Sequence, residues 1–202
     1  MNRRNTAAVA LALLTAASVL TACGDDSSAD APTTTSRTTA ASSSSADNQQ
    51  VPTVSNPLDP TSLVSDPCAA LSSSQLGELG FAGGETRPNE EFEGEACRWR
   101  GSEESLDSVD LTAFVGTTDG LKGVYASKDR SAYFEPTEVA GYPAVYSSVG
   151  DGRAMGMCGL WVGVSDQAVL HIMTNLVSAE SAEASCGLAA DVAEATISTL
   201  GG

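Results

Sequence analysis

Groups that perform chemistry are scarce in this chain. Its 202 residues include one histidine, His171, and 10 basic residues against 26 acidic ones. The sequence has no G-x-S-x-G nucleophile elbow and no C-x-x-C pair with a histidine at ligand spacing, which argues against a serine hydrolase and a zinc site. The glycine-rich stretch GDGRAMGMCG lacks a Walker lysine and precedes a predicted strand, which argues against a phosphate-binding loop.

The histidine and the methionines are the remaining donors to consider. His171 shares a strand face with Val169 and Met173 in the stretch AVLHIMTN, and we expect a satisfied core or edge histidine. Met155, Met157 and Met173, together with His171, offer the donors of a soft copper site. We interpret these methionines as core filler. The sequence therefore predicts no catalytic residue, no cofactor and no metal site, and the protein is predicted not to be an enzyme.

Acidic residues dominate the charge, with a formal net charge of −16. Loss of a signal peptide carrying Arg3 and Arg4 leaves eight basic residues against 26 acidic ones, a net charge near −18. Such a body repels nucleic acid and anionic lipid head groups. The sequence therefore predicts no nucleic-acid partner, and attachment to a membrane requires an anchor.

The N-terminus supplies a candidate anchor. Arg3 and Arg4 precede an apolar run from Ala7 to Leu20, which is typical of a secretory signal peptide and too short for a membrane span. The run ends in LTAC, which fits the bacterial lipobox with Cys23 as the acylated residue. Two or three acyl chains, at about 0.8 kcal/mol per methylene, give stable anchoring. We expect a palmitate-type lipoprotein held by Cys23 at the extracytoplasmic face of the cell membrane.

A polar stretch follows the lipobox. From Gly24 to Gln50 the chain contains no Val, Ile, Leu, Met or aromatic residue. It has nothing to bury, so we expect a disordered tether rich in Ser, Thr and Asp, with a reach of about 30 Å. The predicted organisation is a signal peptide over residues 1–22, the acylated cysteine and tether over 23–63, and one extracytoplasmic domain over 64–202.

Four cysteines lie inside the predicted domain: Cys68, Cys97, Cys158 and Cys186. An even number in an exported domain favours two disulfides, and four cysteines allow three pairings. We favour Cys68–Cys97 and Cys158–Cys186 because the two pairs have similar surroundings, with one cysteine at a helix and the other at a strand. Each bond closes a loop of about thirty residues, worth about 3.6 kcal/mol in the chain-entropy model.

Local patterns predict a single α+β domain, with a mostly antiparallel sheet packed by helices and two disulfides. Ser72 and Gln75 form a capping box for a short helix. Apolar residues alternate in SVDLTAFVG and in the pair CGLWVGV and AVLHIMTN, which predicts a strand and a hairpin. The stretch EVAGYPAVYSS reads as one short strand broken at Gly141–Pro143. The last helix, over residues 178–200, carries a broad apolar arc that predicts packing across the sheet.

Four stretches occur in order along the domain: DPCAAL before the first helix, CRW on the next strand, CGLWVGV in the hairpin and SCGLAADVAEATISTL in the closing helix. Together, from Asp66 to Leu200, they resemble actinobacterial secreted lipoproteins of the uncharacterised domain-of-unknown-function 3558 family. The chain departs from the family pattern at Ser185–Cys186, where the family tends to repeat Asp-Pro-Cys. The resemblance implies an anchored, exported domain and no particular activity, because the family is uncharacterised.

Two functions remain open for this domain. In the first, it is a non-catalytic binding module for an envelope small molecule or lipid, held in a cleft between sheet and helices. In the second, it is an interaction module that docks on a membrane or cell-wall protein. An envelope hydrolase is a third function, which the missing nucleophile motifs disfavour. An apolar cleft would favour the first function, and a solid core with an exposed apolar patch would favour the second.

The lipobox yields the first testable prediction. Cys23→Ser should abolish acylation and release the protein from membranes, because the Cys23 thiol is the predicted lipid acceptor. Metabolic labelling with an alkyne fatty acid and fractionation of the membranes measure both effects. Label and membrane retention that persist in the variant would show an ordinary signal peptide in which the cysteine is incidental.

Overall fold

The structure is a computed structural model that describes residues 50–102, 105–116, 119–178 and 181–202. The predicted signal peptide, Cys23 and residues 24–49 of the predicted tether lie outside the described residues.

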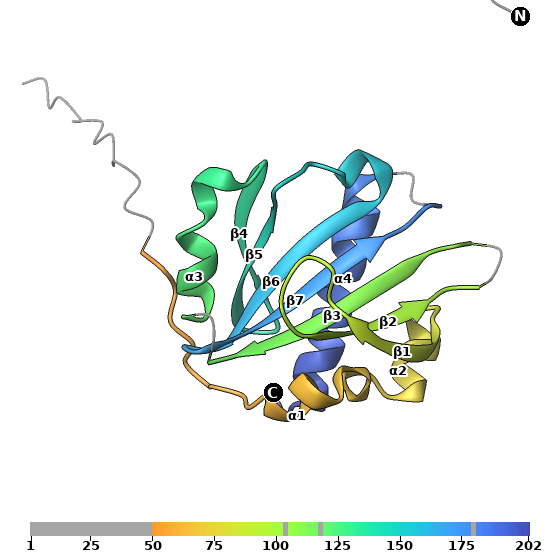
Figure 1. Cartoon of the computed structure of the whole chain (residues 1–202), viewed down its shortest axis with the longest axis horizontal. Coiled ribbons are helices and arrows are strands. Elements are labelled where there is room, and N and C mark those ends of the chain that lie inside the picture. Colours follow the sequence, from red (N-terminus) through yellow and green to blue (C-terminus); the bar gives the residue numbers. More distant parts are fainter. Residues whose placement is uncertain (1–49, 103–104, 117–118, 179–180) are drawn as a thin grey trace, which may run out of the picture. The chain divides into compact units, whose positions relative to one another are not determined.

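One antiparallel sheet organises the described part of the chain (Figure 1). Its strands are β1 (Ala82–Pro88), β2 (Glu95–Arg100), β3 (Ser108–Val115), β4 (Tyr133–Val139), β5 (Tyr142–Ser148), β6 (Met157–Ser165) and β7 (Ala168–Asn175). They lie in the order β1-β2-β3-β7-β6-β5-β4, and every neighbouring pair is antiparallel. The predicted α+β class, with a largely antiparallel sheet packed by helices, is confirmed.

Helices cover the two faces of this sheet unequally. The α-helices are α1 (Thr61–Ser65), α2 (Ser73–Glu78), α3 (Leu121–Tyr125) and α4 (Ala182–Thr199). The long α4 crosses one face, behind the sheet in Figure 1, and buries Val192 and Ile197 against β6 and β7. Of the α-helices in the described residues, the short α3 is the one that packs on the opposite face. Among the described residues, no helix combines the length and the apolar character needed to cross a membrane.

The hydrophobic core is therefore divided between the two faces. On the α4 face, Trp99, Leu111, Leu160 and Leu170 pack with the helix in the larger cluster. On the opposite face, a smaller cluster contains Phe114, Leu121, Val124, Val145 and Val169. Both faces of the central strands are buried, so the sheet is a layer between two cores of different size.

The packed region begins before residue 64, where we expected the domain to start. Leu63 in α1 is 2% exposed and belongs to the larger cluster. The backbone N–H of Leu58 donates to the carbonyl of Val164 at 2.8 Å, and Val54 packs against the same cluster. Residues that we expected in the tether thus contribute to the domain.

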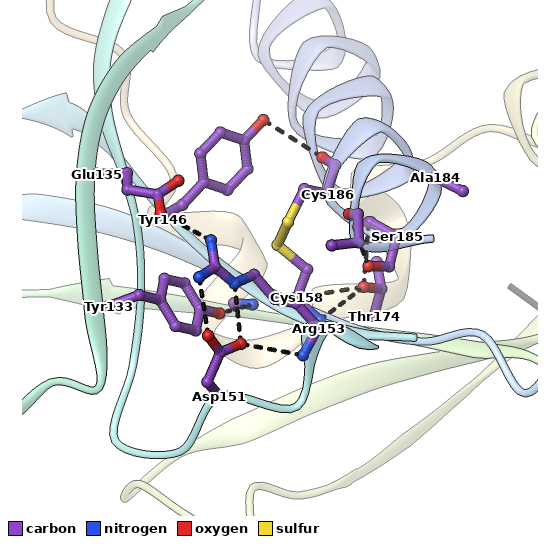
Figure 2. The surroundings of a disulfide bond; sticks show 12 residues. Tyr133, Glu135, Tyr146, Asp151, Arg153, Cys158, Thr174, Ala184, Ser185 and Cys186 are labelled. Carbon is purple, nitrogen blue, oxygen red and sulfur yellow. Dashed lines mark hydrogen bonds and ion pairs between the residues drawn. A yellow bond between two sulfur atoms is a disulfide. The ribbon is translucent and has the colours of Figure 1, made fainter. Parts of the chain in front are cut away.

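Both predicted disulfides are present. Cys68 in the 3₁₀ turn Pro67–Ala70 bonds to Cys97 in β2, and Cys158 in β6 bonds to Cys186 in α4. Figure 2 shows the second bond with hydrogen bonds on both sides of it. The Tyr146 hydroxyl donates to the Cys186 carbonyl at 3.3 Å, and the Thr174 hydroxyl donates to the Ser185 carbonyl at 3.2 Å. These contacts fix the first turns of α4 to the centre of the sheet.

The predicted short helix is also confirmed, as α2. Its N-cap Ser72 accepts from the Gln75 N–H, and the Gln75 side chain accepts from the Ser72 N–H at 2.8 Å, which completes the capping box. Gly80 follows the helix with φ of 79° and allows a left-handed ending. The helix therefore begins at the position that the capping box predicts.

Two strand predictions need correction. The segment read as one broken strand is the hairpin of β4 and β5, turned by Ala140 and Gly141 with φ of 49° and 83°. Positive φ at two consecutive residues suits the twist of a tight hairpin. Strand β1 was not predicted at all, because its side chains are almost all exposed and carry no alternating apolar signal.

Strand β1 generates a stability prediction, because its backbone passes close over the first disulfide. A Cβ at Gly84 would lie 2.5 Å from Cys97 Sγ, 2.8 Å from Cys68 Sγ and 2.8 Å from Trp99 Nε1, whereas a Cβ at Gly83 meets nothing within 4 Å. Gly84→Ala should cost about 2 kcal/mol through overpacking, and the matched control Gly83→Ala less than about 0.5 kcal/mol. Chemical denaturation compares them, and equal midpoints for the two variants would contradict this packing.

Candidate functional site

The strand register places one row of side chains across the face opposite α4. Adjacent members are direct cross-strand partners, and because side chains alternate along a strand, all of them point to the same side. The row runs through β5, β6, β7, β3 and β2 as Val145, Trp161, His171, Thr112 and Ala96. An aromatic pair therefore lies at the middle of this face.

Three rings form a wall on this face. The Trp161 and His171 rings are stacked, with centroids 4.0 Å apart and an interplanar angle of 20°. Phe114 lies beside them, with its centroid 5.9 Å from that of Trp161. Helix α3 closes one end of the wall, because Gly163 has no side chain where Leu121 approaches. A Cβ at Gly163 would lie 2.8 Å from two Leu121 carbons.

The loop between β1 and β2 folds over this wall. Figure 1 shows the loop in front of β7 and β3. The Asn89 side chain holds it there, since its amide donates to the Thr112 hydroxyl at 2.7 Å. The Asn89 side-chain oxygen also accepts from the N–H groups of Glu91 and Phe92 at 2.8 and 2.9 Å. These bonds shape the loop so that it presents Phe92 to the rings below.

The Phe92 ring meets all three rings of the wall edge-on. Its centroid lies 5.7 Å from that of Phe114, 5.2 Å from Trp161 and 5.3 Å from His171, with interplanar angles of 78–89°. Such perpendicular pairs are attractive by about 0.5–1.5 kcal/mol each. Phe92 is nevertheless 36% exposed, so it caps the wall without sealing it.

A cavity of about 580 Å³ opens beside Phe92, and we call it the aromatic groove. Its apolar lining includes the side chains of Phe92, Phe114, Val124, Trp161, His171 and Met173. Its polar edge includes Ser131 and Ser147, whose hydroxyls are 2.9 Å apart, and the charged residues Glu91, Asp119 and Arg130. Mostly apolar walls with a few polar groups are the usual composition of a small-molecule site.

His171 is a lining residue of this groove, and its side chain is buried. It is 5% exposed, and burial lowers the pKa of its imidazole from 6.5 to about 3. None of the described residues makes a hydrogen bond to its ring nitrogens. Among the described residues the buried polar atom without a partner is Trp99 Nε1, so the ring nitrogens of His171 keep contact with solvent. The predicted burial of the side chain is confirmed.

A smaller hollow of about 250 Å³ adjoins the groove and shares Glu91, His171 and Met173 with it. Its wall carries the Arg98–Asp110 pair, in which the guanidinium donates to both carboxylate oxygens at 2.8–3.1 Å. Hydrogen bonding to Asp110 raises the pKa of Arg98. Because these two charges neutralise each other, this hollow offers a ligand polar contact without a net charge from the pair.

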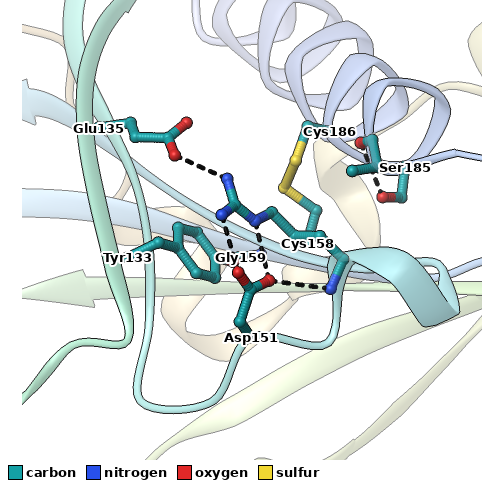
Figure 3. A network of polar contacts seen from close by, with 9 residues as sticks. Tyr133, Glu135, Asp151, Cys158, Gly159, Ser185 and Cys186 are labelled. Carbon is teal, nitrogen blue, oxygen red and sulfur yellow. Dashed lines mark hydrogen bonds and ion pairs between the residues drawn. A yellow bond between two sulfur atoms is a disulfide. The ribbon is translucent and has the colours of Figure 1, made fainter.

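A third hollow, of about 420 Å³, lies at the Gly150–Met157 turn, next to a polar network. The Arg153 guanidinium contacts Asp151 at 2.8 Å and Glu135 at 2.7 Å, and Figure 3 shows the two carboxylates with these contacts as dashed lines. Hydrogen bonds from Arg153 lower the pKa of Asp151 to about 2. The guanidinium carbon of Arg153 also lies 4.0 Å from the ring centroid of Tyr133 in β4. Arg153 therefore holds the turn against β4.

The methionines do not occupy the positions we predicted. Met155 is 66% exposed and Met157 is 37% exposed, so neither is core filler. Both line the third hollow, together with Met173, which also borders the aromatic groove.

The groove and the hollows beside it can be compared with the requirements of metal and nucleophilic sites. Across the described residues, no group of three or more His, Cys, Asp or Glu side chains is placed to hold a metal ion. No nucleophile lies in hydrogen-bond contact with His171 in the same part of the chain. The face therefore provides apolar contact, ring stacking and one buried hydrogen-bonding group.

The fold and groove define an α+β domain with two disulfides and an aromatic pocket on one sheet face. The chain matches the model of the protein of unknown function (DUF3558) over residues 18–199, and it belongs to that family. No curated protein and no solved structure matches it.

Sequence reasoning missed most of this groove. Neither Phe92 nor Trp161 was singled out from the sequence. Asn89 followed by Glu91 and Phe92 was the available signal, because asparagine commonly bonds to backbone groups two residues on and reverses the chain. The pairing of β3 with β7 could not be predicted from the sequence, and this pairing places Phe114 beside Trp161.

His171 yields a pH prediction. Folding keeps its imidazole neutral, with a pKa of about 3 against 6.5 when solvated. The unfolded chain therefore takes up a proton that the folded chain does not, and stability falls as the pH drops from 6.5 toward 3. Between pH 6 and pH 4, this group should remove about 1.4 kcal/mol per pH unit.

Denaturation of wild type and His171→Phe at several pH values measures the effect. The two proteins share every acidic side chain, so the difference between their stabilities isolates the histidine. Wild type should lose stability more steeply than the variant below pH 6. Parallel curves would contradict the depressed pKa.

Proposed function

We propose that this domain is a non-catalytic binding module for a small apolar or lipidic molecule of the cell envelope, held in the aromatic groove. The observation that carries the proposal is His171, whose side chain is 5% exposed and lines an open cavity, with ring nitrogens that no described residue binds. A ligand that accepts from or donates to this ring would replace a hydrogen bond to water, a net gain of about 0.5–1.5 kcal/mol.

The size and composition of the groove support an apolar ligand. Its volume of about 580 Å³ lies within the range of about 300–1,000 Å³ usual for small-molecule sites. The stacked Trp161 and His171 rings present flat faces, and Phe92 already makes edge contacts with them. A ligand with a ring or acyl chain makes contacts of the same kind, and Phe92 is the group that must shift to admit a larger one.

Three features support a position outside the cytoplasm. Cys23 completes the lipobox and provides the proposed acylation site, and the polar stretch after it provides a tether. The described cysteines all form disulfides, which persist in oxidising compartments. We therefore propose a lipoprotein at the extracytoplasmic face of the cell membrane, with the membrane engaged through lipid and without a nucleic-acid partner.

The properties of His171 support binding without turnover. An imidazole with a pKa of about 3 stays neutral at physiological pH and is poorly matched to general acid–base work, which favours a pKa near the operating pH. Its ring contacts are aromatic: Phe92 and Trp161. The histidine therefore suits recognition of a hydrogen-bonding group on the ligand.

A second candidate function is docking on a membrane or cell-wall protein. Leu106 and Val177 are both strongly exposed. They lie at the same end of the sheet, because the neighbouring Ser178 hydroxyl donates to Asp107 at 2.7 Å. Exposed apolar side chains of this kind are used in protein contacts. We favour the groove because it combines a cavity with an imidazole to which no described residue bonds.

Binding of N-phenylnaphthylamine, a neutral fluorescent probe, tests the groove directly. Trp161→Ala should weaken binding about tenfold, equivalent to about 1.4 kcal/mol, because it removes one face of the stacked wall. Val177→Ala, a truncation of an exposed side chain outside the groove lining, is the matched control and should leave the affinity unchanged. Equal affinities for wild type and Trp161→Ala, or a loss confined to Val177→Ala, would contradict the proposal and favour the second candidate.

A further inference from the structure

Every methionine of the chain other than Met1 borders the third hollow. Met155, Met157 and Met173 line it, together with Tyr133 and the Gly150–Gly152 turn. We call this place the methionine hollow. Three methionine side chains from two separate parts of the chain thus line one space of about 420 Å³.

The strand register explains how the thioethers converge. In the β6–β7 ladder Met157 faces Asn175 and Gly159 faces Met173, so Met157 and Met173 are diagonal neighbours on the same face. Diagonal positions are about 7–8 Å apart, within reach of long side chains. Gly159 places no side chain between them, and the Met173 methyl carbon lies 3.3 Å from where a Gly159 Cβ would be.

The third thioether is positioned by the turn before β6. Met155 ends the 3₁₀ turn Arg153–Met155, and its N–H donates to the Gly152 carbonyl at 2.8 Å. Gly156 then reverses the chain with φ of 81°. The ion pairs of Arg153 with Asp151 and Glu135 hold this turn in place. Met155 is therefore held near the hollow by a braced backbone.

The exposure of Met155 and Met157 argues against a role in core packing. A flexible apolar side chain normally fills gaps in a core, yet Met155 and Met157 remain accessible while the core is built from Leu, Val, Ile and aromatic residues. An apolar lining alone requires no sulfur, and Leu would serve equally. The property that distinguishes Met from Leu here is the soft thioether donor.

We propose that the methionine hollow binds one Cu(I) ion through the thioethers of Met155, Met157 and Met173. Neutral thioether sulfur selects Cu(I) over harder divalent ions. The described cysteines are consumed in disulfides, so thioethers are the available soft donors of the described domain. Glu91 and Asp151 also line the hollow; Asp151 is paired with Arg153, and Glu91 favours a cation electrostatically. Met173 and Glu91 border the aromatic groove as well, but binding of an ion in the hollow does not depend on a ligand in the groove.

Titration with Ag(I), a redox-stable ion of the same softness, tests the site in chloride-free buffer. The protein is the full chain carrying Cys23→Ser, which removes the one cysteine outside the disulfides. Native mass spectrometry should find one Ag(I) per chain. With ¹³C-methyl methionine labelling, the methyl resonances of Met155, Met157 and Met173 should shift together, and that of Met1 should serve as the unshifted reference.

Met→Leu variants conserve volume and keep the fold. Each single variant should weaken Ag(I) binding at least about tenfold, and the triple variant should abolish it. The melting temperature without metal checks that the variants are folded. Absence of stoichiometric Ag(I), or undiminished binding by the folded triple variant, would overturn the site and leave the methionines as an apolar lining.

Discussion

The attachment of α4 to one face of the sheet is the constraint on which the rest of this structure depends. The Cys158–Cys186 bond joins the helix to central strand β6, and the hydrogen bonds from Tyr146 and Thr174 hold its first turns in place (Figure 2). A sheet with two apolar faces needs cover on both. Because α4 is committed to one face, the other is left to the short α3 and to a loop, and a cavity remains between them.

That incomplete cover determines the chemistry of the exposed face. Ordinary packing would place aliphatic side chains there, as it does under α4. The central positions instead carry Trp161, His171 and Phe114, with Phe92 laid across them by the loop that Asn89 shapes. No described residue bonds to the ring nitrogens of His171 at the centre of this wall, so they remain available to a ligand in the groove. The aromatic residues that pack on this face are therefore also the residues of the proposed binding site.

Much of the architecture was predictable because its signals are local. The capping box at Ser72 and the β6–β7 hairpin are short-range features, and both were confirmed. The disulfide pairing followed from the similar surroundings of the four cysteines. The groove was not predictable, since it depends on β3 pairing with β7, which places Thr112 opposite His171. The exposure of Met155 and Met157 also escaped prediction, because composition favours methionine in cores and only the turn before β6 brings these two to the surface.

The central claim is that the face opposite α4 holds an apolar ligand around His171. Native mass spectrometry of full-length protein purified from its own membranes in mild detergent tests it most directly, because no probe has to be chosen. The account predicts one small apolar adduct per chain in wild type and its loss when Trp161→Ala is purified in the same way. A wild-type protein without any adduct, or the same adduct on both proteins, would contradict it.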